Sequence, residues 1–177
     1  MDTQQGATIY KGGRFSADPW SHLADDAPVP AAGYAILPLK RWLADAATLA
    51  RHPGPLGLAL GPADPLELDA ATLARFAVIA IAFPKFSDGR GYSTARRLRD
   101  RLQFKGELRA TGDVLLDQVP LMLRLGFDAL EIIDRATRAA LERGHRFAIT
   151  EVYQAPRRGR ADASPRQRAR EVAAVGL

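Results

Sequence analysis

From residue 33 onward, short apolar runs alternate with segments whose apolar residues recur every three or four positions. Uninterrupted apolar runs of this kind are typical of buried strands, and the wider spacing is typical of helices with one buried face. The expected strands cover residues 34–37, 56–60, 77–83, 107–110 and 127–133, and the expected helices cover residues 39–50, 66–76, 94–104, 114–125 and 135–143.

Five successive strand–helix units predict an α/β fold in which right-handed crossovers form a parallel sheet flanked by helices. The run AVIAIAF at residues 77–83 has no polar alternation, so we expect it to be the central strand. A closed barrel of this type needs about eight units. The pattern therefore leaves two arrangements open, an open doubly wound sheet and a barrel-like fragment.

Residue types that begin and end helices mark several of these segments. Asp64 and Pro65 are typical of an N-cap and a first helical residue, and Gly126 and Gly144 are typical of residues just past a helix end. Pro120 falls inside the expected helix 114–125, where it would kink the helix at a cost of about 3 kcal/mol.

The two ends of the chain depart from this pattern. In residues 7–16, two β-prone runs flank Gly12-Gly13, which predicts a tight hairpin. Residues 18–30 hold three prolines and predict a connecting loop with Trp20 packed on the core, and residues 147–153 predict a last strand. The expected organisation is a hairpin and loop at residues 1–32, an α/β domain at residues 33–154 and a tail at residues 155–177.

The composition of the 177 residues excludes several chemistries. The chain has no cysteine, so it offers no disulfide, no thiolate ligand for zinc or an iron–sulfur cluster, and no thiol redox chemistry. Its first ten residues are mostly polar, and no apolar run approaches the roughly 18 residues of a membrane span. We therefore expect a cytoplasmic protein without a membrane partner.

The net charge of +5 and the pI near 10 arise mostly in the tail. Residues 155–177 carry six arginines against two acidic residues and almost no large apolar residue. Such a segment cannot offset its conformational entropy by burial, so we expect it to be disordered. Binding to nucleic acid would rest on this tail alone, and no aromatic residues alternate with its basic ones. We do not expect nucleic acid as a partner.

The stretch FPKFSDGRGYSTARRLR at residues 83–99 is the main candidate site. A strand runs through a glycine loop into a helix opened by Ser93 and Thr94, and the unpaired N–H groups and positive dipole of a helix start favour anions. The alternative is a tight turn in which Asp88 pairs with Arg90 and Ser93 only caps the helix. The candidate binding residues here are Lys85, Ser87, Asp88, Gly89, Arg90, Gly91, Tyr92, Ser93 and Thr94.

A second candidate cluster follows the next expected strand and adds the binding candidates Arg109, Thr111 and Gly112. Asp113 comes directly after a glycine at an expected helix start, so we expect it to cap that helix. Asp113 and Asp117 would share one helix face at the i, i+4 spacing. Together with Asp88 they are the candidates for acid–base catalysis or for holding magnesium.

Apart from the magnesium alternative at these three aspartates, the sequence predicts no metal site, and it predicts no cofactor. GRGYST at residues 89–94 lacks the third glycine of a dinucleotide-binding loop and the lysine of a Walker loop. No Ser-His-Asp set is evident. We expect His22, His52 and His145 to be solvated or packing residues.

Three consecutive blocks, FPKFSDGRGYSTARRLR, FKGELRATGDVLLDQ and LRLGFDALEI, resemble a bacterial family, the domain of unknown function 934. The resemblance covers about residues 33–153 and leaves out the basic tail. Members of that family are commonly encoded beside sulfite reductase genes and are often labelled oxidoreductases of sulfite reduction. Pro120 departs from the family pattern, in which a bulkier apolar or aromatic residue is usual.

The resemblance and the anion-suited loop together predict an accessory protein of sulfur assimilation that acts with sulfite reductase. Residues 85–94 would hold an oxyanion or an acidic surface of that enzyme. The alternative is an enzyme acting on a small phosphorylated or sulfonated metabolite, with Asp88 or Asp113 as the base and Lys85 and Arg90 as the clamp. Whether the chain is itself an enzyme stays open. The resemblance implies an oxidoreductase, but the sequence contains no redox-cofactor motif and no cysteine.

Overall fold

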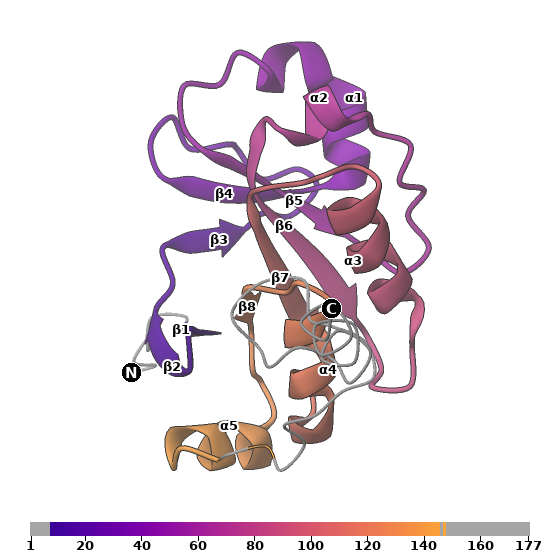
Figure 1. The fold of residues 1–177 in the computed structure, drawn as a ribbon. Helices are drawn as coiled ribbons and strands as arrows, with labels where there is room; N and C mark the ends of the chain where they lie inside the picture. The colour runs from indigo at the N-terminus through magenta and orange to yellow at the C-terminus, as the bar shows by residue number, and fades with distance from the viewer. Residues whose placement is uncertain (1–7, 146, 148–177) are drawn as a thin grey trace, which may run out of the picture.

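One eight-stranded sheet forms the centre of the computed structural model, which describes residues 8–145 and 147 (Figure 1). Its strands are β1 (Thr8–Lys11), β2 (Arg14–Ala17), β3 (Trp20–His22), β4 (Tyr34–Pro38), β5 (Leu56–Leu60), β6 (Phe76–Phe83), β7 (Glu107–Gly112) and β8 (Ala129–Leu130). Their order across the sheet is β2-β1-β8-β7-β6-β5-β4-β3. From β3 to β8 every neighbouring pair is parallel, whereas β1 is antiparallel to both β8 and β2.

The parallel strands β3 to β8 lie side by side in the order in which they occur in the chain. A doubly wound sheet reverses its order at a switch point, so this sheet has the barrel-like arrangement of the two that the sequence left open. Its edge strands β2 and β3 are linked through Asp18 and Pro19 alone, and the sheet curls into a half-barrel.

Two expectations about the sheet are corrected. The sheet is mixed rather than purely parallel, because the predicted Gly12-Gly13 hairpin pairs its strand β1 with β8. Residues 20–22, expected within a loop, form the strand β3. The hairpin itself is confirmed, and both glycines have the positive φ that such a turn requires.

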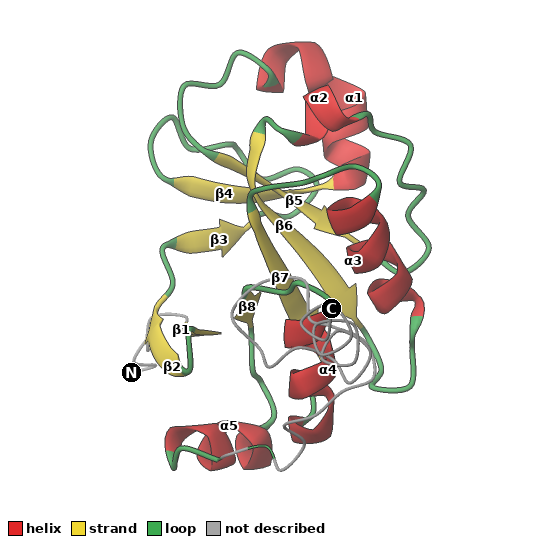
Figure 2. Cartoon of the chain, viewed as in Figure 1, coloured by secondary structure: helices red, strands yellow, loops and turns green. Residues whose placement is uncertain are grey.

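The helices follow the parallel strands and pack on one face of the sheet, as Figure 2 shows for α1, α2 and α3. Within the described residues they are α1 (Leu39–Leu49), α2 (Ala70–Leu73), α3 (Arg90–Asp100), α4 (Val119–Arg124) and α5 (Arg135–Glu142), with a 3-10 turn at Leu116–Gln118. Their buried side chains, among them Trp42, Leu98 and Met122, share one core with Leu58 and Ile79 of the strands.

The opposite, concave face of the sheet carries a smaller apolar cluster of Ile36, Val78 and Ala80, against which Trp20 packs. Gly57 makes room for it, since a Cβ at that position would lie 2.9 Å from Ile36 Cγ1 and 3.3 Å from Trp20 Cζ3. The expectation that Trp20 packs on the core is confirmed. This face holds the buried polar network described below.

Two expectations about the helices are corrected. Asp69 rather than Asp64 caps α2, and its carboxylate accepts a hydrogen bond from the Thr72 N–H at 2.7 Å. Pro120 lies in the first turn of α4, where a missing N–H removes no helical hydrogen bond, so it does not kink a helix. Gly126 follows α4 with a φ of +93°, which confirms its expected role after the helix end.

The expected strand at residues 147–153, apart from residue 147, and the basic tail lie outside the described residues. Within the part of the chain that the structure describes, no helix has both the length and the apolar character needed to cross a membrane.

Candidate functional site

The loop at residues 84–89 joins β6 to α3 at the carboxyl-end edge of the parallel strands, where α/β sheets bind their ligands. The Asp113 carboxylate accepts a hydrogen bond from the Phe86 N–H at 2.9 Å, and the Gln118 side-chain amide donates to the Phe86 carbonyl at 2.7 Å. Asp113 therefore fixes this loop instead of capping a helix. Both backbone polar groups of Phe86 are therefore hydrogen-bonded, whereas the residue as a whole is 57% exposed.

Asp88 and Arg90 pair with each other at the start of α3. Arg90 Nε and Nη2 donate to the two carboxylate oxygens of Asp88 at 2.9 and 2.7 Å, and the Arg90 N–H donates to Asp88 Oδ1 at 3.2 Å. These hydrogen bonds and the charge of Arg90 lower the pKa of Asp88 to about 2. The negative charge that a helix start favours is thus supplied by the chain itself.

This pairing matches the tight turn that the sequence offered as the alternative, with one difference. The helix α3 begins at Arg90 with Gly89 as its N-cap, so Ser93 and Thr94 lie inside the helix. The Thr94 hydroxyl donates to the Arg90 carbonyl at 3.3 Å. Neither side chain caps α3.

Gly91 packs the first turn of α3 onto β6. A Cβ at this position would lie 2.6 Å from Phe83 Cζ, so the close approach of helix and strand requires glycine. The Tyr92 ring lies 5.1 Å from the Phe83 ring, centroid to centroid. Burial first, and then the charge of Asp117, raise the pKa of Tyr92. The residues Phe83, Gly91 and Tyr92 form the packed base beneath the loop.

The outward face of α3 extends the positive charge of the loop. Between residues 85 and 101, the carboxylates are Asp88 and Asp100, and Asp100 lies 3.6 Å from Arg96. Ser93 borders a shallow cavity of about 400 Å³ on this face together with three of the arginines. The exposed cations of residues 85–101 are Lys85, Arg90, Arg96, Arg97 and Arg101, and we call this surface the cationic face.

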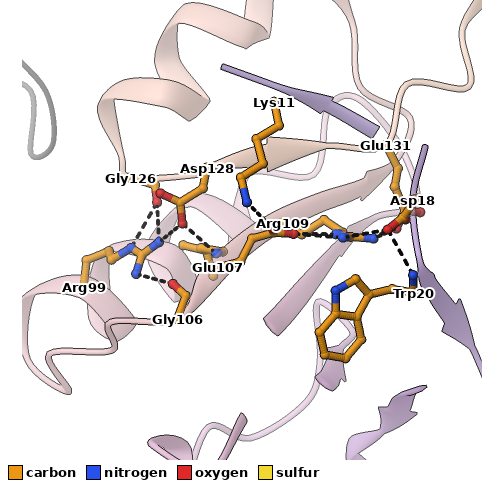
Figure 3. A network of polar contacts seen from close by, with 11 residues as sticks. Lys11, Asp18, Trp20, Arg99, Gly106, Glu107, Arg109, Gly126, Asp128 and Glu131 are labelled. Atoms are coloured by element: carbon orange, nitrogen blue, oxygen red, sulfur yellow. Dashed lines mark hydrogen bonds and ion pairs between the residues drawn. The ribbon is translucent and has the colours of Figure 1, made fainter. Parts of the chain in front are cut away.

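Arg109 lies on the concave face of the sheet, on β7, and its side chain is 1% exposed (Figure 3). Its Nη1 donates to Asp18 at 2.5 Å and to Glu131 at 3.1 Å, its Nη2 donates to Asp18 at 3.1 Å and to Glu107 at 2.8 Å, and its Nε donates to Glu107 at 3.1 Å. Lys11 also binds Glu107, at 2.6 Å. Because a guanidinium has five N–H groups, an oxyanion at Arg109 would have to displace one of these carboxylates.

The charges of this network hold one another in the ionised state. Burial acts to raise the pKa values of Glu107 and Glu131, but hydrogen bonds and positive charges outweigh burial, so both pKa values lie below the usual range. Lys11 and Arg109 provide this stabilisation for Glu107, and His22 and Arg109 provide it for Glu131.

Thr111 and Gly112 end β7 close to the backbone of β6. Thr111 Oγ1 lies 3.5 Å from the Ile81 carbonyl, and a Cβ at Gly112 would lie 2.4 Å from the Phe83 carbonyl oxygen. Gly112 also has a φ of +95°, so both its conformation and its surroundings require glycine. These two residues shape the strand end beside the loop.

The acidic candidates do not converge on one point. Asp113 binds the loop backbone, Asp88 binds Arg90, and Asp117 lies exposed near Tyr92. In residues 8–145 and 147, no three histidine, aspartate or glutamate side chains are grouped so as to hold a metal ion.

Two polar contacts were not predicted from the sequence. His22 Nε2 lies 2.8 Å from Glu131 Oε1, and the buried Arg99 donates to the Gly126 carbonyl and to Asp128. The sequence held one indication of the His22 contact. Asp18, Trp20 and His22 are spaced two residues apart, so in an extended segment their side chains lie on the same face. The partner of His22 lies 109 positions away, where no local pattern could indicate it.

The fold and the loop define an α/β half-barrel with a cationic face that begins at the carboxyl ends of its strands and continues along α3. The model of a family described as bacterial protein of unknown function (DUF934) matches residues 57–163, which is more than half of the chain. The chain belongs to this family, as the sequence blocks predicted. No curated protein and no solved structure matches it.

Proposed function

We propose that this chain is an accessory protein of sulfur assimilation that docks on an acidic surface of sulfite reductase through its cationic face. The family resemblance set out above supports the link to sulfite reduction, while the family itself is of unknown function. The geometry of residues 85–101 supports docking on a macromolecule over capture of a small oxyanion.

The observation that carries the proposal is the exposed combination of one aromatic side chain and several cations. Phe86 projects from a loop whose backbone is fixed by Asp113 and Gln118. Within the described residues, no carboxylate forms an ion pair with Lys85 or Arg97. Aromatic and arginine side chains dominate binding energy at protein interfaces, and complementary charge steers association.

The start of α3 is less suited to a small free oxyanion. Asp88 already places a carboxylate on the Arg90 N–H and guanidinium. Sulfite or sulfate would have to displace this carboxylate, whereas an acidic protein surface can engage Lys85, Arg96 and Arg97 while the Asp88–Arg90 pair stays intact.

A calorimetric titration distinguishes docking on a protein surface from binding of a small oxyanion. The full chain and its Arg90→Ala variant are titrated with sulfite, sulfate and phosphate. We expect no saturable binding of any anion to either protein. Saturable binding that prefers one anion and is lost in Arg90→Ala would show that the loop is an oxyanion site.

The pathway is tested in cells. Deletion of the gene should slow growth on sulfate but not on cysteine, and the wild-type gene should restore growth. A gene carrying Lys85→Glu and Arg97→Glu should fail to restore it, although both side chains are exposed and outside the core. Unchanged growth of the deletion strain on sulfate would contradict the role in sulfur assimilation.

A metabolite enzyme at the same loop remains the alternative prediction. In that role Asp88 or Asp113 would act as base, with Lys85 and Arg90 as the clamp. Asp88, however, engages Arg90, and Asp113 accepts a hydrogen bond from the N–H of the loop residue at position 86. Both would have to exchange partners before acting on a substrate. Turnover of a phosphorylated or sulfonated metabolite that is abolished by Asp88→Asn would support this alternative.

A further inference from the structure

A cavity of about 940 Å³ is bordered by three parts of the chain. They are the strand β3, the residues that directly follow β8, and the helix α5. Trp20, Ile132 and Ile133 give it apolar walls, and His22 and Glu131 give it a polar side. His22 and Glu131 stand at the carboxyl ends of their strands, the edge at which barrel-type folds place their active sites. None of these residues belongs to the cationic face.

His22 lines the cavity, and its hydrogen bond within the described residues occupies one of its two ring nitrogens. His22 Nε2 is bound to Glu131 at 2.8 Å, and no hydrogen bond among the described residues reaches its Nδ1. By contrast, both ring nitrogens of His52 are bound, Nε2 to the Pro30 carbonyl and Nδ1 to the Gly54 backbone. An imidazole with one nitrogen on a carboxylate and the other unbound is the arrangement of a proton-exchanging group.

Glu131 is in turn held by the buried guanidinium of Arg109, at 3.1 Å (Figure 3). Arg109 is fixed by Asp18 and Glu107 on its other sides. Arg109 therefore ties Glu131 to two further carboxylates, and Glu131 in turn holds the imidazole of His22.

The charges around His22 leave one negative charge unbalanced. On the sheet, the carboxylates of Asp18, Glu107 and Glu131 face the cations of Lys11 and Arg109. On α5, the charges of the ion pair between Arg138 and Glu142, at 2.9 Å, cancel. Counted over these described residues with a neutral imidazole, the site has a net charge of −1, which favours a proton or a cationic group over an anion.

We propose that this cavity binds a small organic amine, with His22 Nδ1 as the group that exchanges a proton with it and Glu131 as the positioning residue. The bound ammonium supplies the missing positive charge next to Glu131. When its N–H bond breaks, the proton passes to His22 Nδ1 and the electron pair stays on the amine nitrogen. The product is a neutral amine beside an imidazolium, so the charge of the site does not change. This inference does not depend on the docking role of the cationic face.

The ligand class is tested with three probes of one shape and different charge: benzylamine, benzyl alcohol and benzoate. Each is titrated into the full ¹⁵N-labelled chain while the ring signals of His22 and the indole signal of Trp20 are followed by NMR. Benzylamine should shift both signals saturably and bind at least tenfold more tightly than benzoate. Equal or tighter binding of benzoate, or no saturable shift with benzylamine, would overturn the proposal.

The role of His22 is tested by its tautomer. At pH 8 the ¹⁵N spectrum should show a protonated Nε2 and a bare Nδ1, and addition of benzylamine should shift Nδ1 more than Nε2. A protonated Nδ1 in the wild type would contradict the proposal.

Two variants separate positioning from folding. Glu131→Gln should weaken benzylamine binding at least tenfold and remove the tautomer preference of His22. Because Glu131 also touches Arg109, His22→Gln serves as a second variant on an exposed side chain, and it should weaken binding similarly. The matched control His52→Gln should leave binding unchanged. Unchanged binding in His22→Gln would refute the assignment.

Discussion

Replacing Arg109 by methionine should destabilise the fold more than any other single arginine replacement on the sheet face. Methionine keeps much of the volume of the side chain but removes five hydrogen bonds and the charge shared by Asp18, Glu107 and Glu131. Removing one partner of a buried ion pair costs about 3–5 kcal/mol. Because two of the three carboxylates are partly exposed, we expect a loss of about 3 kcal/mol in the free energy of unfolding at pH 7.

The loss should shrink in acid, and this pH dependence distinguishes charge from packing. In the wild type the pKa values of Glu107 and Glu131 are lowered on folding. Such carboxyl groups stabilise the fold above their unfolded pKa of about 4.3, and they lose that contribution as the pH falls through the folded value. In Arg109→Met the pKa values of these two carboxyl groups rise. As the pH falls, they therefore become neutral at a higher pH in the variant than in the wild type, and the cost of their unpaired charge is removed. The difference between the two proteins should therefore be smaller at pH 4.5 than at pH 7.

Urea unfolding followed by circular dichroism measures both quantities. Arg97→Met, which makes the same substitution on the exposed surface of α3, is the matched control and should leave the midpoint unchanged. Arg109→Lys, which keeps the charge but not the planar fork, should fall between the wild type and methionine. A loss below about 1 kcal/mol, or an equal loss at both pH values, would refute the electrostatic account of Arg109.

Two further predictions concern the loop. Gly91→Ala should lower the urea midpoint, because overpacking against Phe83 costs about 1–3 kcal/mol and exceeds the gain of about 1 kcal/mol in helix propensity. Gly89→Ala is the control, since a Cβ there would meet nothing closer than 3.9 Å. Equal midpoints for the two variants would contradict the packing argument. The carboxyl carbon of Asp88 should titrate by NMR with a pKa of about 2 and move toward the usual value in Arg90→Gln, whereas an unshifted value in the wild type would mean that the pair does not form in solution.

The order and type of most regular elements were predictable because the signals for them are local. The run at residues 56–60 is a strand with those bounds in the structure, and the apolar run before Pro84 is the central strand β6. The Asp88–Arg90 pair was foreseen as an alternative because the two residues are separated by one position. Hydrophobic periodicity and turn-forming residues act over a few positions, so a single sequence is enough to recognise them.

The features that the sequence did not predict depend on distant partners. Arg109 was placed with an anion site, but its charge is balanced by Asp18, which lies 91 positions earlier in the chain. The strand β3 has only three residues and owes its existence to pairing with β4. The curl of the sheet depends likewise on which strands pair, and a single sequence does not carry that information.

The docking proposal is tested most directly by titrating purified sulfite reductase from the same cell with the full chain. We predict saturable binding that weakens with salt. The charge reversals Lys85→Glu and Arg97→Glu should each reduce the affinity at least tenfold. Arg143→Glu, an equal charge reversal just after α5, should leave the affinity unchanged. No binding of the wild-type chain, or the same loss in Arg143→Glu as on the cationic face, would contradict the account.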